Sequence, residues 1–370
     1  MPHFLRNTQY AILITSFLTS ALLSACFLLS CSSTPPQTTL LIYRFDPPAF
    51  IEYSADFQQI KEIPFSIPPN CGLFNTFPAP IGNFLAIELS CPNGQTVLFL
   101  DTSTSLSTGS ETGAPTQPVT DSDAHFLAWM SDGTAAYLKI DSLGNPQIIR
   151  AYTNRTSNIL PINEYTYDLS AKPDSYDFTF TLSRGLGQGS EIHLAQNNGR
   201  KTQQLHADPY NYISFARFSP DGIQIAFIKI PDTQTPFTVG ELWVMDSNGM
   251  NARKLADADA GHGYTANWSP DGKRIAFVVR ENPEDENANQ SSDALISNIY
   301  IVEVENGRLT QITNLTDGRA ETPHWSPDGN TLTFNVVING RMNVQNADII
   351  TGRMRPLATE SACCPAWMRK

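Results

Sequence analysis

One short phrase recurs three times in this chain, and it constrains the fold more than any other feature. The copies FARFSPDGIQIAF, TANWSPDGKRIAF and TPHWSPDGNTLTF occupy residues 215–227, 265–277 and 322–334. In their shared Pro-Asp-Gly turn, proline fixes φ, aspartate bonds to its own backbone and glycine supplies a positive φ. Alternating apolar residues flank the turn, so each copy predicts a β-hairpin.

Two further strands follow each hairpin. After the second copy the chain reads NIYIVEVENG over residues 298–307 and then RLTQIT, and ELWVMDSNG with RKLA occupies the same place after the first. Four antiparallel strands separated by turn residues, repeated along the chain, predict the blades of a β-propeller.

This pattern resembles the PD40 (WD40-like) repeat of TolB-type β-propellers. The turn, the aromatic residue before it and the spacing of the downstream strand agree in three copies over residues 215–355. The resemblance implies an all-β propeller fold and, for function, contacts between proteins of the bacterial cell envelope. It also implies six blades, the usual number for TolB-type propellers.

The repeat spacing favours seven blades rather than six. Weaker copies precede the three strong ones, and the position before the turn recurs at intervals of 42 to 57 residues. It is occupied in order by Pro78, Trp129, Ala171, Phe218, Trp268, Trp325 and Trp367. Four of the five tryptophans fall here, and a tryptophan buries a large apolar area, so we expect this position to pack between neighbouring blades.

The last of these units is incomplete, because the chain ends three residues after Trp367. Residues 38–63, at the other end of the domain, read as three alternating strands without a first one. We therefore expect a closing blade with the C-terminal strand innermost and the N-terminal strands outside it, which removes exposed strand edges. A six-bladed ring with the N-terminal strands packed outside is the alternative.

The first 30 residues have the pattern of a lipoprotein signal peptide, with a short polar start and a long apolar run. We favour Cys31 as the lipidated residue because the polar tether of residues 31–37 follows it, and Cys26 is the alternative. A secretory signal without lipidation also fits. The expected organisation is signal peptide 1–30, tether 31–37 and a single propeller domain 38–370, exported and lipid-anchored in the bacterial cell envelope.

The formal net charge of -12 argues against a nucleic-acid partner, because an acidic surface repels phosphate. An acidic body is not drawn to an anionic membrane surface either, so we expect membrane contact through the lipid anchor only. The expected partner is an envelope protein or glycan, and the chain is expected to be a monomer.

Four cysteines lie in the propeller region, where an exported protein can keep disulfides. Strand order places Cys71, Cys91, Cys363 and Cys364 on one face, near the closing blade. We expect Cys71 to pair with Cys91, or one of them to pair with Cys363 or Cys364. A bond between the adjacent Cys363 and Cys364 is a third possibility.

Catalytic patterns are weak in this sequence. Four residues are candidates for the central channel or the ligand-binding face: His125, Arg217, Asn267 and His324. A non-catalytic binding scaffold is favoured, and no cofactor is predicted. The alternative is a propeller-type polysaccharide lyase, or another carbohydrate-active enzyme, with a metal held in the channel by His125, His262 and His324.

Two loops remain as secondary candidates. Asp257 and Asp259 could bind calcium, although the ligand series of an EF-hand is missing. Residues 280–298 form a long acidic loop, which is either a partner contact or a disordered insertion.

Overall fold

The computed structural model describes residues 38–80, 82–103, 121–151, 157–233, 235, 237–259, 262–358 and 361–369. The chain forms two units, Met1–Gln37 and Thr38–Lys370. The expected signal peptide and tether, with Cys26 and Cys31, lie outside the described residues. Within these ranges no helix has the length and apolar character that crossing a membrane requires.

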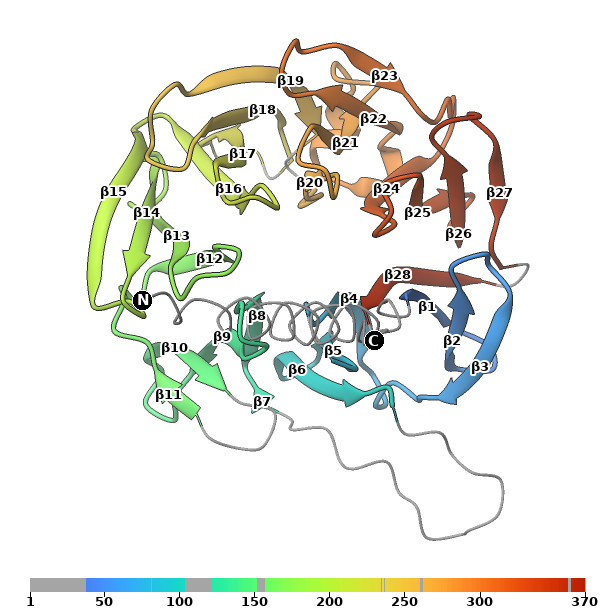
Figure 1. Ribbon diagram of the computed structural model, residues 1–370, viewed down its shortest axis with the longest axis horizontal. Coiled ribbons are helices and arrows are strands. Elements are labelled where there is room, and N and C mark those ends of the chain that lie inside the picture. The colour runs from blue at the N-terminus through green and yellow to red at the C-terminus, as the bar shows by residue number, and fades with distance from the viewer. Residues whose placement is uncertain are drawn as a thin grey trace, which may run out of the picture. The chain divides into compact units, whose positions relative to one another are not determined.

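The second unit is a ring of four-stranded antiparallel sheets around a central axis (Figure 1). This confirms the all-β propeller prediction. The strands divide into seven blades, the number that the repeat spacing favoured. One parallel residue pair, Ser297 with Arg319, joins the fifth and sixth blades into a single eight-stranded sheet.

The strands of each blade are given from the innermost outwards. The first blade consists of β4 (Gly72–Pro78), β5 (Phe84–Cys91), β6 (Gly94–Asp101) and β7 (Asp121–Ser122). The second consists of β8 (Ala124–Trp129), β9 (Ala135–Ile140), β10 (Pro146–Ala151) and β11 (Ser157–Ile159). The third consists of β12 (Thr166–Ala171), β13 (Phe178–Ser183), β14 (Ser190–Gln196) and β15 (Lys201–Asp208). The fourth blade consists of β16 (Asn211–Phe218), β17 (Gln224–Pro231), β18 (Val239–Asp246) and β19 (Arg253–Asp259). The fifth consists of β20 (Asn267–Trp268), β21 (Arg274–Arg280), β22 (Ser297–Glu303) and β23 (Leu309–Gln311). The sixth consists of β24 (Arg319–Trp325), β25 (Thr331–Ile338), β26 (Arg341–Asp348) and β27 (Met354–Pro356).

The seventh blade joins the two ends of the domain. Its strands are β28 (Ala362–Arg369), β1 (Thr38–Arg44), β2 (Ala49–Ser54) and β3 (Gln59–Pro64). The C-terminal β28 is innermost and pairs antiparallel with the N-terminal β1. The expected closing blade, with one C-terminal strand and three N-terminal strands, is therefore present.

The two faces of the ring differ in the loops that they carry. Because strands in a blade alternate in direction, the loops that lead into each innermost strand share a face with the loops between second and third strands. We call this the cysteine face, since Cys71 precedes β4 and Cys91 ends β5 on it. The Pro-Asp-Gly turns and the loops between third and fourth strands lie on the opposite face.

Each Pro-Asp-Gly turn is fixed by its own side chains. In the first copy the Ser219 hydroxyl donates to Asp221 Oδ1 at 2.5 Å and accepts from Gln224 N–H at 3.0 Å. This serine hydrogen bond is the largest of the effects that lower the pKa of Asp221. Gly222 has a φ of 69°, which a side chain would strain, and the turn of the preceding blade packs against it.

The tryptophans of the repeat connect neighbouring blades, as predicted. The indole N–H of Trp129 donates to the backbone oxygen of Phe77 at 2.8 Å, across the boundary between the first two blades. Trp268 and Trp325 make the same bond to the preceding blade. In the closing blade Trp367 donates to the Thr333 hydroxyl at 3.1 Å, so an indole bond also joins the sixth and seventh blades.

Candidate functional site

The innermost strands enclose a cavity of about 330 Å³ on the axis of the ring. Six of the seven blades contribute to its wall. The lining residues are Asn75, Thr76, Phe77, Pro78, Phe126, Leu127, Ala128, Trp129, Leu169, Ser170, Ala171, Arg217, Gly263, Thr265, Asn267, Thr322 and His324. Three of the four predicted channel residues, Arg217, Asn267 and His324, are therefore brought together at one site.

Arg217 contributes the positive charge of this wall. Its Nη1 lies 2.6 Å from Asp168 Oδ1, and the other oxygen of this buried carboxylate accepts from Ala216 N–H at 3.0 Å. Asp168 lies on β12 and Arg217 on β16, so the ion pair joins the third and fourth blades. The guanidinium thus neutralises a neighbouring carboxylate while it faces the cavity.

Asn267 and His324 differ in their hydrogen bonding. The Asn267 amide donates to Pro323 O at 2.7 Å and to Thr265 Oγ1 at 3.2 Å, which joins the fifth and sixth blades. The His324 ring has no hydrogen-bond partner among the described residues. Its removal from water lowers its pKa from 6.5 to about 4, so the imidazole is neutral at pH 7.

His125, the fourth candidate for the channel or the ligand-binding face, does not line this cavity. His125 lies on β8, its side chain is half-exposed, and its Nδ1 is 3.0 Å from Glu88 Oε1 on β5. That hydrogen bond raises the pKa of His125. His125 is thus directed to Glu88 of the neighbouring blade, whereas Phe126, Leu127, Ala128 and Trp129 of the same strand line the cavity.

His262 also lies away from the cavity wall, so the three histidines of the lyase alternative do not share one site. Its Nδ1 is 2.9 Å from the buried Asp259, and its ring stacks on Phe237 with centroids 4.5 Å apart. Asp257, the other expected calcium ligand, pairs with Lys254 at 2.6 Å. No group of three or more metal-ligating side chains occurs in the described ranges.

The other polar groups of the cavity wall bond to a neighbouring blade or to the next strand of their own blade. The Thr76 hydroxyl donates to Cys364 O at 3.2 Å, and Thr322 Oγ1 accepts from the Asn335 amide at 3.0 Å. Ser170 Oγ accepts from Phe218 N–H at 3.3 Å. On the apolar side of the wall Phe77 and Phe126 stack with centroids 4.5 Å apart. These polar groups of the wall are therefore bonded within the ring.

The four cysteines pack against one hydrophobic cluster at the junction of the first and seventh blades. Cys71 and Cys91 form a disulfide, the first of the arrangements considered from the sequence. Cys363 and Cys364 also form one, so no disulfide crosslinks the two ends of the domain.

The acidic loop of residues 280–298 is ordered rather than a disordered insertion. It contains two 3-10 turns, η1 (Glu286–Asn289) and η2 (Ser292–Ala294). The buried Arg280 guanidinium holds the loop by donating to Asn289 Oδ1 at 2.8 Å and to Asp285 O at 2.7 Å. Phe237 N–H of the fourth blade donates to Asn289 O at 3.2 Å, which attaches the loop to its neighbour.

Eight of the exposed large apolar side chains lie on the cysteine face, and none of them was among the candidates from the sequence. They are Phe45, Phe74, Ile140, Leu143, Tyr165, Leu186, Tyr210 and Ile338. Tyr165 and Tyr210 are 64% and 80% exposed and precede the innermost strands of adjacent blades. Two residues further on, Tyr167 and Tyr212 stack with centroids 4.5 Å apart. The repeated Tyr-x-Tyr pattern was the available signal.

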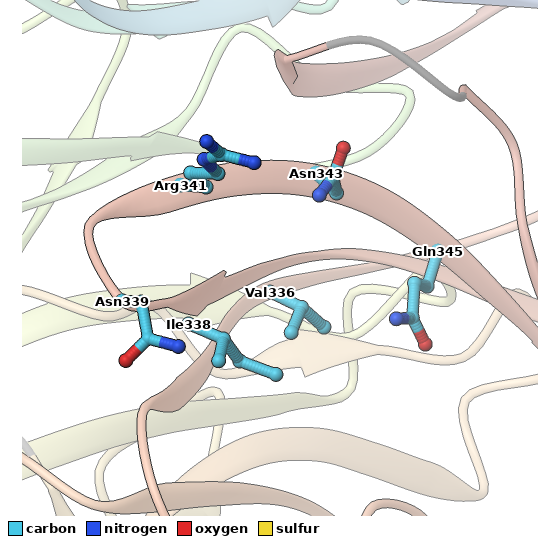
Figure 2. A pocket seen from close by; sticks show the side chains of 6 residues that line it. All are labelled: Val336, Ile338, Asn339, Arg341, Asn343 and Gln345. Atoms are coloured by element: carbon cyan, nitrogen blue, oxygen red, sulfur yellow. The ribbon is translucent and has the colours of Figure 1, made fainter.

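A second hollow, of about 550 Å³, lies on the sixth blade, away from the axis. Figure 2 shows the residues that line it, which come from β25, β26 and the turn between them: Val336, Ile338, Asn339, Arg341, Asn343 and Gln345. The hollow lies on the second and third strands of this blade, whereas the channel residues belong to the innermost strands. None of these six residues was a candidate from the sequence.

Comparisons with known proteins agree with this architecture. The TolB beta propeller domain (PD40) profile matches residues 178–368, more than half of the chain. Dipeptidyl-peptidase 5 of Porphyromonas gingivalis is 21% identical over 152 residues, which are 40% of this chain and 21% of that enzyme. The chain thus spans about a fifth of the length of this curated relative.

Two solved structures share the fold at low identity. The β-propeller domain of the Trilobed protease from Pyrococcus furiosus, described as having an open velcro topology, is 14% identical with a TM-score of 0.51 and covers 79% of this chain and 84% of its own. An oligogalacturonate lyase from Vibrio parahaemolyticus is 11% identical with a TM-score of 0.51 and covers 87% and 86%. With its repeats, its seven blades and the profile match, the chain belongs to the TolB β-propeller domain family.

Proposed function

We propose that this protein is an exported lipoprotein of the bacterial cell envelope, and that its propeller binds a protein or glycan partner without catalysing a reaction. One observation carries the proposal. Four exposed aromatic side chains, Phe45, Phe74, Tyr165 and Tyr210, lie on the cysteine face, while the polar groups around the channel largely bond to neighbouring blades. Aromatic side chains are enriched at protein interfaces relative to the rest of the surface.

The lipid anchor expected at Cys31 supports this role. It would hold the domain at a membrane surface and leave the loops of the ring available to a partner. Loops on a rigid scaffold are where binding residues usually lie, and a closed ring of sheets is such a scaffold.

The second candidate, a polysaccharide lyase, has one specific observation in its favour. His324 and Arg217 line the same axial cavity, so a base and a cation stand at one site. Against it, His125 and His262 lie elsewhere and are each occupied by a carboxylate. The lyase therefore ranks below the binding scaffold.

The test is affinity purification of the full lipidated chain from native membranes, followed by binding measurements with the purified partner. The variant Tyr165→Ala/Tyr210→Ala is compared with Tyr176→Ala, whose ring is 66% exposed on the opposite face. We expect the double variant to weaken binding at least about tenfold and the control to leave it unchanged. Equal binding by both variants would contradict the proposal, as would turnover of a uronate polymer by the purified protein.

A further inference from the structure

The hollow on the sixth blade is an amphipathic slot. In the hairpin of β25 and β26, Ile338 lies opposite Arg341 and Val336 opposite Asn343. Since alternate residues of a strand share a face, Arg341, Asn343 and Gln345 form one polar row beside the aliphatic row of the neighbouring strand. Figure 2 shows both strands and the turn residue Asn339 that ends the slot.

The polar side chains of this slot have no protein partner. Within the described ranges Asn339, Arg341, Asn343 and Gln345 make no side-chain hydrogen bond and no ion pair. By contrast Asn335, on the same hairpin, bonds both to Thr322 and to Cys364 N–H. The slot therefore presents one guanidinium and three carboxamides, all of which are free to bond to an added molecule.

The slot lies beside an open strand edge. The outermost β27 pairs only with Gln345–Ala347 of β26, and Leu357 N–H donates to Val344 O at 2.9 Å just beyond it. Backbone groups alternate between the two sides of a strand, so those of Met342 point to the same outer edge. Among the described residues Met342 has no backbone partner there. In the third blade, β15 covers β14 along its whole length.

From these features we infer that an extended peptide segment of a partner protein, carrying a carboxylate, adds to the outer edge of β26 and fills the slot. Its backbone would pair with the open edge at Met342, as in other cases of strand addition. Its carboxylate would bond to Arg341, because a guanidinium binds carboxylates through paired hydrogen bonds. An apolar side chain would cover Val336 and Ile338. The inference rests on the proposed binding function and names a site for it.

Charge and backbone chemistry favour this occupant over a sugar chain. The six lining residues include a cation and no acid, although the whole chain carries a net charge of -12. Asp317 stands on the adjoining loop but makes no ion pair with Arg341 in the described structure. A sugar chain would use the carboxamides and leave the backbone edge unpaired, whereas a peptide uses both.

The experiment begins with a photo-crosslinker. The full chain is made in its native cells with p-benzoylphenylalanine in place of Asn339, or in place of Arg353 as a control on the opposite side of the same blade. Adducts are mapped by mass spectrometry, and the crosslinked segment is synthesised as a peptide. Its Kd is then measured with the wild-type chain, Arg341→Gln and Arg353→Gln, and again after its carboxylate is converted to an amide.

We expect the Asn339 adduct to map to a segment with an acidic residue or a C-terminus. Arg341→Gln and loss of the peptide carboxylate should each raise Kd about tenfold, and Arg353→Gln should leave it unchanged. Hydrogen exchange of the Met342 amide should slow when the peptide binds. An adduct with a glycan, no adduct beyond the control, an unchanged Kd for Arg341→Gln, or unaltered Met342 exchange would each overturn the inference.

Failure here is distinguishable from failure of the proposed function. If binding of the partner depends on Tyr165 and Tyr210 but not on Arg341, the proposed scaffold function stands and only the peptide-binding slot is rejected. If binding depends neither on the two tyrosines nor on Arg341, both the scaffold function and the slot are rejected.

Discussion

Leu40 lies directly opposite Trp367 in the pairing of β1 with β28. These residues stand near the two ends of the domain, and both are almost completely buried in one cluster with Val344 of the sixth blade. The ring is thus closed by hydrogen bonds and apolar packing, since both disulfides of the described residues join cysteines at one end or the other. Closure therefore depends on the last eight residues of the chain.

Truncation after Ala362 removes nearly all of β28 and tests this closure. We expect loss of cooperative unfolding, because β1 and the sixth blade would both expose apolar surface to water. Urea denaturation followed by circular dichroism measures it. Removal of Lys370 alone, which leaves β28 whole, is the control. A truncated chain with near-wild-type stability would contradict the closing blade.

The hydrogen bond from the Trp129 indole to the neighbouring blade predicts that Trp129→Phe lowers the free energy of unfolding. The Phe77 carbonyl would lose its donor, and the smaller ring would leave space, so the free energy of unfolding should fall by about 1–3 kcal/mol. Trp243→Phe is the matched control, because its N–H bonds to Glu241 on its own strand. Equal effects of the two substitutions would show that the position before the turn has no special role.

The disulfide between Cys71 and Cys91 closes a loop with a sequence separation of 20. In the chain-entropy model such a loop contributes about 3 kcal/mol. We expect Cys71→Ser/Cys91→Ser to lower the free energy of unfolding by roughly this amount under oxidising conditions. The difference should vanish when both proteins are measured in excess reductant, and its persistence there would assign the loss to packing instead.

His324 predicts a dependence of stability on pH. Its pKa is about 4 in the fold and 6.5 ordinarily, so the unfolded chain binds the proton first as the pH falls. The free energy of unfolding should therefore decrease between pH 6.5 and 4, by up to about 3 kcal/mol from this residue. His324→Gln should show a shallower decrease over the same range. Parallel curves for the two proteins would refute the low pKa, which NMR titration of the ring measures directly.

The signal region predicts a difference between its two cysteines. Cys31→Ser should release the protein from the membrane fraction, because lipidation supplies the membrane affinity. Cys26→Ser should leave it anchored. Detergent-phase partitioning and metabolic labelling with a fatty-acid analogue measure both, and the reverse result would move the lipidated residue to Cys26.

Three of the four channel residues predicted from the sequence line the axial cavity. Arg217, Asn267 and His324 each precede the aligned aromatic position, and the strand period carried them correctly to the cavity wall. His125 lies on an innermost strand as well, but it stands three positions before Ala128, the residue that precedes the aligned Trp129, and its side chain contacts Glu88 of the first blade.

The sequence by itself determined the blade and the closure of the ring. Turn chemistry, alternating strands and the repeated tryptophan are local patterns, and the spacing of the incomplete first and last units favoured their completing each other. The tertiary structure alone decided what the surface offers. The exposed tyrosines lie on adjacent blades, which are formed by distant segments of the chain. The open edge beside Arg341 exists because the outermost strand β27 is short. Neither spacing nor composition encodes those contacts, because they arise only when blades pack side by side.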